Sequence, residues 1–558
     1  MSTNTSQQLE QCLELIKPHT TDESKFAGLL LIPRILQPDD IPAIEAVFEA
    51  IDFKFLERLL RTTKQVPEET DAMNSIAVNI LASFSISVNL INREEFIARI
   101  PTLMKTLISS QNLETRKEIA RILFKLSEGS EGLELILNKY NFDYILRLYE
   151  RPEGEENEEI QTLGLQLISF SIDQWNDFVY TQKVANDIQL KNTLIETLPF
   201  ILETLGAQYH QRHDKVKFEI MSTLIRLLEE IPQEFTKAIG RSTTSFYSWT
   251  GSISSGTKDV LSHKHASKPK EDGLKLVALM LHHFGWDWLF SVSEHDKIKK
   301  EEKEKFAALV VELACIEINV RLDELSQESV SLEDLESKQS ATIIDSYEIL
   351  EKVISFLSTY MQDQEDEGTS NRTPIFSNES LLKLHNSLKS TFSVILEFIL
   401  LKQADFPSVK FLENHFLLAT IRVLASWLAE DDSLHKDALE ILGLLIDVAR
   451  SSDNNQDVTP LLFLCPAFLY MTESPEMHDK FSSLGGPRML VENLISTFDR
   501  QKSYVSKNHL ANLLYPYVQL LYNIESPKKF PLHSETEKET FSRIMEFIRE
   551  KFGGDSFN

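Results

Sequence analysis

The side chains of this chain that can do chemistry are scattered, and none stands in a spacing typical of an active site. The sequence contains no GxGxxG, GxxxxGK[ST], HExxH, GxSxG or CxxC pattern, the spacings that cradle phosphate, hold a metal or present a nucleophile. We therefore predict that the protein is not an enzyme, with no catalytic residue, no metal ligand and no cofactor. An enzyme with an unfamiliar active site is the alternative, and it would place groups with shifted pKa values together in a cleft.

The cysteines and histidines also lack ligand spacings. Cys12, Cys315 and Cys465 lie far apart in apolar helical contexts, so we expect small buried hydrophobic residues in a reducing compartment. Three histidine pairs are close in sequence: His210 with His213, His263 with His265, and His282 with His283. The first pair is within reach of one metal ion, but no further ligand follows in register. We expect the second pair to be solvated and the third to be packed or capping.

Two segments are typical of protein recognition. Residues 115–128, TRKEIARILFKLSE, form a basic amphipathic helix; a calmodulin-type target is one interpretation, and an ordinary repeat helix with its polar face outward is the one we favour. The second segment is an aromatic group that consists of Phe284, Trp286, Trp288 and Phe290. We favour core packing between repeats for this group over a peptide-docking patch. Asn79, Asn512 and Asn523 are candidates for pairing with a ligand backbone, but the sequence assigns no side chain to a protein-binding site.

Residues 416–450 indicate that pairs of amphipathic helices form the framework of the chain. FLLATIRVLASWLAE and LHKDALEILGLLIDVAR repeat apolar residues at helical spacing, and the DDS between them is typical of a chain reversal and a helix start. Such a helix pair needs neighbouring pairs to bury its apolar seam. A phrase of the form x-L-x-x-L-L recurs at 51–60, 100–108, 141–149, 198–206 and 485–495. The first three copies are separated by steps close to the ~40–47 residues of armadillo and HEAT repeats.

We therefore predict an all-α fold, an armadillo/HEAT-like α-solenoid of stacked antiparallel helix pairs in a right-handed superhelix. Composition shifts divide the chain into six segments. These are N-terminal armadillo-like repeats (1–240), a polar surface loop (241–270), helical repeats with long helices (271–361), an acidic disordered loop (362–377), C-terminal armadillo-like repeats (378–552) and a frayed tail (553–558).

The charge of the chain restricts its partners. The 558 residues include 85 Asp and Glu and 57 Lys and Arg, which gives a formal net charge of −28. This charge disfavours binding to nucleic acid and anionic membranes and favours basic or extended protein segments as partners. A plainer interpretation is that the acidic residues keep a large helical surface in solution. The polar N-terminus and the lack of a ~20-residue apolar run predict no signal peptide and no transmembrane segment. We expect a cytoplasmic protein whose contact with membranes is peripheral and made through partners.

Five phrases, in the same order, resemble the neurochondrin family. They are ESKFAGLLLIPRIL (23–36), AVFEAIDFKFLERLLRTTK (46–64), GLKLVALMLHHFGWDWL (273–289), LVVELACIEINVRLDEL (309–325) and ATIRVLASWLAEDDSLHKDALEILGLLIDVAR (419–450). The resemblance implies a cytoplasmic, non-enzymatic scaffold or adaptor with an armadillo-type fold, which binds signalling proteins or receptor tails and in animals is linked to neurite outgrowth. The chain departs from the animal pattern by stopping before the longer animal C-terminal region and by its polar stretch at 241–270. The alternative function is a transport-type adaptor that recognises basic peptides.

Overall fold

The computed structural model describes the chain except for short gaps. The described residues are 3–62, 67–150, 155–178, 188–233, 236, 244–263, 267–292, 299–326, 331, 335, 338–365, 373–450, 460–501, 507–524 and 531–552. They form helices with short connections and one two-residue antiparallel pairing, β1 (Ser291–Val292) with β2 (Thr373–Pro374). The predicted all-α, armadillo-like fold is confirmed. The chain divides into two compact units, Met1–Leu279 with His295–Lys297, and Met280–Glu294 with Ile298–Asn558.

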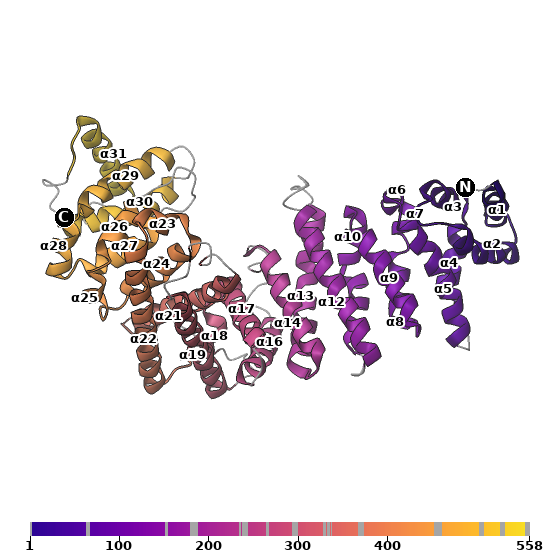
Figure 1. Cartoon of the computed structure of the whole chain (residues 1–558), viewed down its shortest axis with the longest axis horizontal. Coiled ribbons are helices and arrows are strands. Elements are labelled where there is room, and N and C mark those ends of the chain that lie inside the picture. Colours follow the sequence, from indigo (N-terminus) through magenta and orange to yellow (C-terminus); the bar gives the residue numbers. More distant parts are fainter. Residues whose placement is uncertain are drawn as a thin grey trace. The chain divides into compact units, whose positions relative to one another are not determined.

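The first unit stacks its helices in two layers (Figure 1). Its elements are α1 (Thr3–Leu15), α2 (Asp22–Ile35), α3 (Ile41–Ala50), α4 (Phe53–Arg61), α5 (Pro67–Phe84), α6 (Val88–Ile91), α7 (Glu94–Ile97), α8 (Ile100–Ser109), α9 (Leu113–Leu126), α10 (Ser130–Leu137), α11 (Lys139–Leu146), η1 (Arg147–Glu150), α12 (Glu155–Asn176), α13 (Ile188–Gln211), α14 (Lys215–Glu230), α16 (Thr244–Ser262) and the part of α17 (Ser267–Phe284) before Met280. One layer runs α2, α5, α9, α12, α14, and the other runs α4, α8, α11, α13, α16, each helix contacting the next. The recurring phrase falls on α4, α8, α11 and α13, so it marks the second layer.

Hydrogen bonds between successive repeats confirm their length. The Ser87 hydroxyl donates to the Glu45 carboxylate over 3.0 Å, and Arg93 donates to Glu49 over 2.8 Å. These partners are 42 and 44 positions apart in the sequence, within the range of armadillo and HEAT repeats. These two repeats are thus joined by polar contacts at their edge as well as by their apolar seam.

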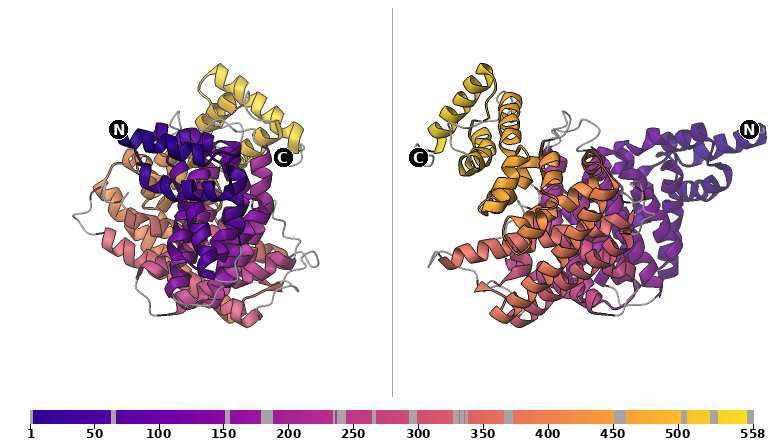
Figure 2. Two further views of the ribbon diagram at one scale, coloured as in Figure 1. Left: turned by 90° about the vertical axis from the view of Figure 1, so that its right-hand side faces the viewer. Right: turned by 60° about the vertical axis from the view of Figure 1, so that its left-hand side comes forward.

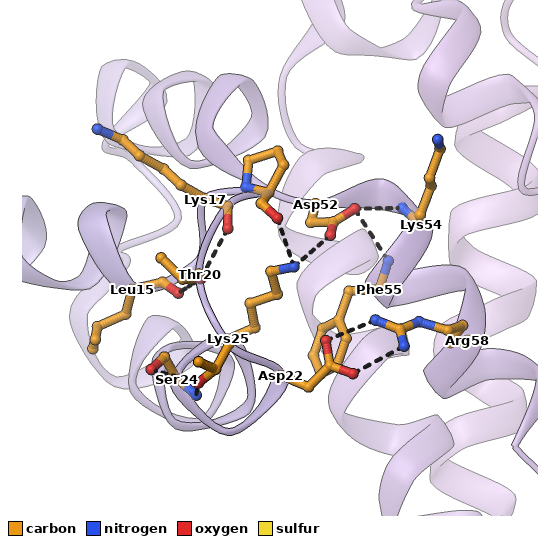
Figure 3. Close-up of polar contacts among 12 residues, drawn as sticks. Leu15, Lys17, Thr20, Asp22, Ser24, Lys25, Asp52, Lys54, Phe55 and Arg58 are labelled. Carbon is orange, nitrogen blue, oxygen red and sulfur yellow. Dashed lines mark hydrogen bonds and ion pairs between the residues drawn. The ribbon is translucent and has the colours of Figure 1, made fainter.

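A polar cluster at the N-terminal end fixes α2 against α4 (Figure 3). The buried Lys25 ammonium donates to the Pro18 carbonyl over 3.0 Å and to the Asp52 carboxylate over 2.8 Å. Asp52 is also the N-cap of α4, and its other oxygen accepts from the first backbone N–H groups of that helix. Beside it, Arg58 and Asp22 form a two-bond ion pair that is exposed to solvent.

The second unit is built in the same way. Its helices are α18 (Asp287–Phe290), α19 (Lys300–Leu325), α21 (Lys338–Glu365), α22 (Asn378–Asp405), α23 (Ser408–Glu413), α24 (His415–Leu428), α25 (His435–Ala438), α26 (Leu442–Arg450), α27 (Pro460–Met471), α28 (Pro475–Ser483), α29 (Gly486–Gln501), α30 (Lys507–Ile524) and α31 (Glu535–Phe552). The right-hand view of Figure 2 shows the later of these helices, in orange and yellow, following one another. One layer runs α21, α24, α27, α30. The corner between α28 and α29 needs glycine, because Gly485 has a φ of 82°.

For the helix pair at 416–450, the predicted buried positions are confirmed, but the prediction of one continuous second helix is wrong. The apolar positions of both halves are buried, as the helical spacing predicted; they are Leu417, Ile421, Leu424, Leu428, Leu434, Ala438, Ile441, Leu445 and Val448. The second half is two helices, α25 and α26, with a turn between them, and not one. Asp431 accepts from the Ser433 N–H over 2.8 Å, so it stabilises the reversal, and α25 begins without a side-chain cap.

The predicted polar loop at 241–270 is wrong over Thr244–Ser262, which form α16. Its small residues serve close packing against α13: a Cβ on Gly256 would lie 2.5 Å from the Tyr209 ring. The acidic loop at 362–377 is also corrected, since α21 continues to Glu365 and Thr373–Pro374 pair with β1. Residues 366–372 and the tail 553–558 lie outside the described residues. The other segment boundaries stay predictions.

Candidate functional site

A cleft of about 660 Å³ opens in the first unit where three helices of one layer lie side by side. The helices are α9, α12 and α14 (Figure 1). Each buries an apolar stripe against the second layer and turns its remaining face outward, as amphipathic helices of a repeat stack do. On α9, for example, Ile122, Leu123 and Leu126 are fully buried while Phe124 is half-buried and lines the cleft.

The aromatic part of the cleft is one phenylalanine from each helix, Phe124, Phe170 and Phe218, and the buried Leu165 adds an aliphatic side chain. The rings of Phe124 and Phe170 meet edge to face, with their centroids 5.3 Å apart and an angle of 85° between their planes. All three side chains are half-buried. Aromatic rings that stay partly open to solvent on adjacent helices are a ready docking surface for the side chains of a partner.

The charged groups of the cleft come from α12 and α14. Arg226 donates two hydrogen bonds to the Asp173 carboxylate, one of them 2.8 Å long, so this ion pair joins the two helices. The half-buried Glu219 carboxylate accepts from the Thr162 hydroxyl. Its charge reaches the buried Tyr149, whose phenol pKa is raised well above the ordinary value by burial and further by Glu219.

Neutral polar groups lie between these charges. Gln166 and Ser222 are exposed, Ser169 is half-buried, and all three line the cleft. None of the described residues makes a hydrogen bond with the side chains of these three. The cleft thus offers an amide and two hydroxyls beside aromatic rings. This combination can bind an extended backbone and its side chains.

The sequence did not single out these cleft residues, although a signal for them exists. Phe124, Phe170 and Phe218 recur at intervals of 46 and 48 positions, close to the repeat length. Because each falls on the polar side of an otherwise regular apolar stripe, the recurrence of phenylalanine at this spacing predicts an aromatic row on one face. The residue type alone does not indicate this, since most phenylalanines of the chain are core residues.

The basic helix at 115–128 is α9, and it is an ordinary repeat helix. The guanidinium of Arg116 is buried and donates to the Ser110 carbonyl over 2.6 Å. The remaining bases pair with neighbouring acids: Lys117 with Glu114 and Glu159, Arg121 with Glu118, and Lys125 with Glu128. The favoured interpretation is confirmed, because these charges are already compensated within the chain.

The aromatic group after α17 packs in the core, as expected. Phe284, Trp288 and Phe290 are buried, and Phe290 stacks on Phe356 with centroids 5.0 Å apart. Trp286 contacts Phe356 at 5.4 Å. These rings therefore anchor the start of the second unit and do not form a docking patch.

Cys12, Cys315 and Cys465 are free and buried, which confirms their expected role as small hydrophobic residues. Burial raises the thiol pKa of Cys12 and Cys315 to about 11 and that of Cys465 to about 12. At neutral pH these thiols are protonated and therefore poor nucleophiles.

The histidine candidates are not brought together. His210 and His213 are exposed. His263, the residue after α16, contacts Asp259 of that helix over 3.2 Å, and His265 lies outside the described residues. His282 contacts Glu348 over 2.9 Å, and His283 is buried. In the described part of the chain no three His, Cys, Asp or Glu side chains gather closely enough to hold a metal ion.

The candidate asparagines are exposed on two helices. Asn79 lies on α5, next to α9, whereas Asn512 and Asn523 lie on α30 in the second unit. Asn523 lines a smaller cleft of about 480 Å³ with His478, Glu473 and Asp479. Their pairing with a ligand stays a prediction. Across the described ranges, no helix combines the length and apolar character needed to cross a membrane.

The stacked helix pairs, with their cleft on one layer, define an armadillo-type helical-repeat protein. The sequence matches the family model of neurochondrin over residues 3–552. The chain therefore belongs to the neurochondrin family, in agreement with the resemblance of its five phrases.

Relatives of known name cover most of the chain. The neurochondrin homolog of Drosophila melanogaster is 23% identical over 467 residues, 81% of this chain and 57% of that protein. Neurochondrin of Xenopus laevis is 23% identical over 79% of this chain and 56% of that protein, and human neurochondrin is 22% identical over 79% and 54%. The chain thus spans slightly more than half the length of these curated relatives.

Two solved structures are similar over most of their length. An engineered protein is 15% identical, with a TM-score of 0.48, over 93% of this chain and 99% of that chain. A chain from work on the phosphorylation switch that controls the interaction between cadherin and beta-catenin is 11% identical. It has a TM-score of 0.43 over 92% of this chain and 94% of that chain.

Proposed function

We propose that this chain is a non-enzymatic scaffold that binds an extended segment of a partner protein along the cleft of α9, α12 and α14. The observation that supports this most is the set of three side chains without partners among the described residues, Gln166, Ser169 and Ser222, beside a row of aromatic rings. In the free chain water can bond these polar groups, and a ligand backbone that displaces this water can take over the hydrogen bonds.

The family supports the wider part of this proposal. Partners among signalling proteins or receptor tails, and a cytoplasmic location, follow from the neurochondrin resemblance and are proposals for this chain. The three buried free thiols are consistent with a reducing compartment.

A transport-type adaptor for basic peptides is the second candidate, and the net charge of −28 favours it. We would expect such an adaptor to hold its peptide with a regularly repeated ladder of Trp and Asn side chains, and the sequence shows no such ladder. Of the five tryptophans, Trp175, Trp249, Trp288 and Trp427 are buried. We therefore favour the scaffold.

Photo-crosslinking from beside the cleft tests the proposal. A photoreactive amino acid replaces Lys125, which is 50% exposed on α9 directly after Phe124 of the cleft, and in a control it replaces Tyr140, which is 81% exposed on α11. We expect the Lys125 position to form an adduct with one defined partner segment in native extracts, identified by mass spectrometry. A synthetic peptide of that segment should then bind the purified chain. Equal adducts from both positions, or a segment that does not bind as a peptide, would contradict the proposal.

A further inference from the structure

The Glu219 carboxylate is the uncompensated charge of the cleft. Among the described residues its hydrogen-bond partner is the neutral Thr162 hydroxyl, and no cation pairs with it. The neighbouring carboxylate, Asp173, is neutralised by Arg226. A half-buried carboxylate that has lost part of its water and gained no counter-charge attracts a cation more strongly than a solvated one.

The basic side chains of the neighbouring α9 already form ion pairs within the chain. On α9, Lys117, Arg121 and Lys125 each pair with a glutamate, at 2.6, 2.5 and 2.7 Å. An acidic ligand would therefore have to break an existing ion pair to find a cation. A purely apolar side chain would cover Glu219 without a partner and leave its charge dehydrated, which is unfavourable.

The aromatic rings complete a site for a cation on a long apolar stem. Phe218 precedes Glu219 directly on α14, and Phe170 lies on the adjacent α12. Lysine and arginine carry three or four methylene groups below their charge, and these groups pack on ring faces and edges while the head reaches a carboxylate. Gln166 and Ser222 also line the cleft, and their amide and hydroxyl groups can pair with the backbone of such a segment.

We propose that the cleft selects a segment with a lysine or arginine side chain, which lies along Phe170 and Phe218 and forms an ion pair with Glu219. This inference rests on the proposed function, because it names the chemistry of the segment that the cleft binds. It predicts one basic position in the bound segment, flanked by residues that suit the remaining aromatic surface around Phe124.

A library of short random peptides displayed on phage, selected against the purified chain and against Glu219→Gln in parallel, tests this inference. The matched control is Glu230→Gln. It removes the same charge from the same helix, but Glu230 is held by the Asn176 amide and is not among the residues that line the cleft. We expect enrichment of Lys or Arg at one position with the natural chain and with Glu230→Gln, and loss of that enrichment with Glu219→Gln. Replacing this residue by norleucine in an enriched peptide should weaken binding about ten- to a hundredfold, the effect of one charge-assisted hydrogen bond.

The outcomes separate this inference from the proposed function. One outcome is that the selected peptides lose binding to Phe170→Ala, which shows that they require the cleft, and yet share no basic position. This outcome would overturn the inference and would still support the proposed scaffold function. Enrichment of a basic position to the same degree with Glu219→Gln would also overturn it. Peptides that bind equally well to Phe170→Ala would mean that the cleft is not the binding surface, and both proposals would then fail.

Discussion

Replacing Trp175 by alanine is expected to lower the free energy of unfolding of the first unit by about 3–5 kcal/mol, the usual effect of truncating a fully buried tryptophan. Trp175 is 0% exposed, and its indole N–H donates to the Leu190 carbonyl over 3.3 Å. It thereby joins the end of α12 to the start of α13, the two layers of the unit. Phe170 and Asp173 of the cleft lie on the same helix within two turns, so the cleft should loosen as well.

Hydrogen exchange followed by mass spectrometry measures this effect helix by helix, which suits a repeat protein that does not unfold in one step. Peptides from α12 and α13 should exchange faster in Trp175→Ala, while peptides from α27 in the second unit should not change. Trp175→Phe keeps most of the volume and loses the hydrogen bond, so its effect should be about 1–2 kcal/mol. Unchanged exchange of α12 in Trp175→Ala would contradict the packing described.

Breaking the Lys25–Asp52 ion pair is the second large effect that we expect. In Lys25→Met the Asp52 carboxylate, 14% exposed, would lose the ammonium that lies 2.8 Å away. Leaving one member of such a buried pair uncompensated typically costs about 3–5 kcal/mol. The matched control is Arg58→Met in the neighbouring exposed pair with Asp22 (Figure 3), which should cost less than about 1 kcal/mol. Exchange rates of α2 and α4 peptides measure both.

The Lys25–Asp52 pair should also make the stability of this end depend on pH. Partial burial raises the pKa of Asp52, but the Lys25 ammonium and the N–H groups of Phe55 and Lys54 outweigh burial and hold the pKa below its ordinary value. The stabilisation is therefore present above the unfolded pKa of about 3.9 and is lost as the pH falls through the folded value. The difference between the natural chain and Lys25→Met should shrink below about pH 4. A difference that is constant with pH, or a cost equal to that of Arg58→Met, would contradict this account.

The sequence predicted the repeat architecture because periodic burial determines it. Apolar residues at helical spacing must lie on one face, so the seam of 416–450 could be predicted residue by residue, and the recurring phrase marked one layer of the first unit. The sequence predicts a loop at 241–270 because serine, threonine and glycine usually indicate one. In α16 these small residues instead allow α13 to approach closely. Trp249 and Ile253, four positions apart and therefore on one face of the helix, are buried.

The cleft was harder to predict, since it depends on which helices lie side by side. Thr162 and Glu219 are 57 positions apart, and Asp173 and Arg226 are 53 apart, both longer than the repeat step found nearer the N-terminus. The long α13 between α12 and α14 shifts the register, and no local pattern indicates the size of that shift. The spacing of Phe124, Phe170 and Phe218 is the part of the site that the sequence does carry.

The measurement that tests the central claim most directly is the affinity of the cross-linked partner segment, as a synthetic peptide, for a chain whose cleft has been filled. Ser222→Trp places a large side chain on the exposed face of α14 without touching the core, and Tyr140→Trp does the same on α11. Isothermal titration should show binding at least about tenfold weaker for Ser222→Trp, because the indole takes the space of a ligand side chain that is worth about 1.4 kcal/mol or more. Tyr140→Trp should bind as the natural chain does. Equal affinity for Ser222→Trp and the natural chain would contradict the assignment of this cleft as the binding surface.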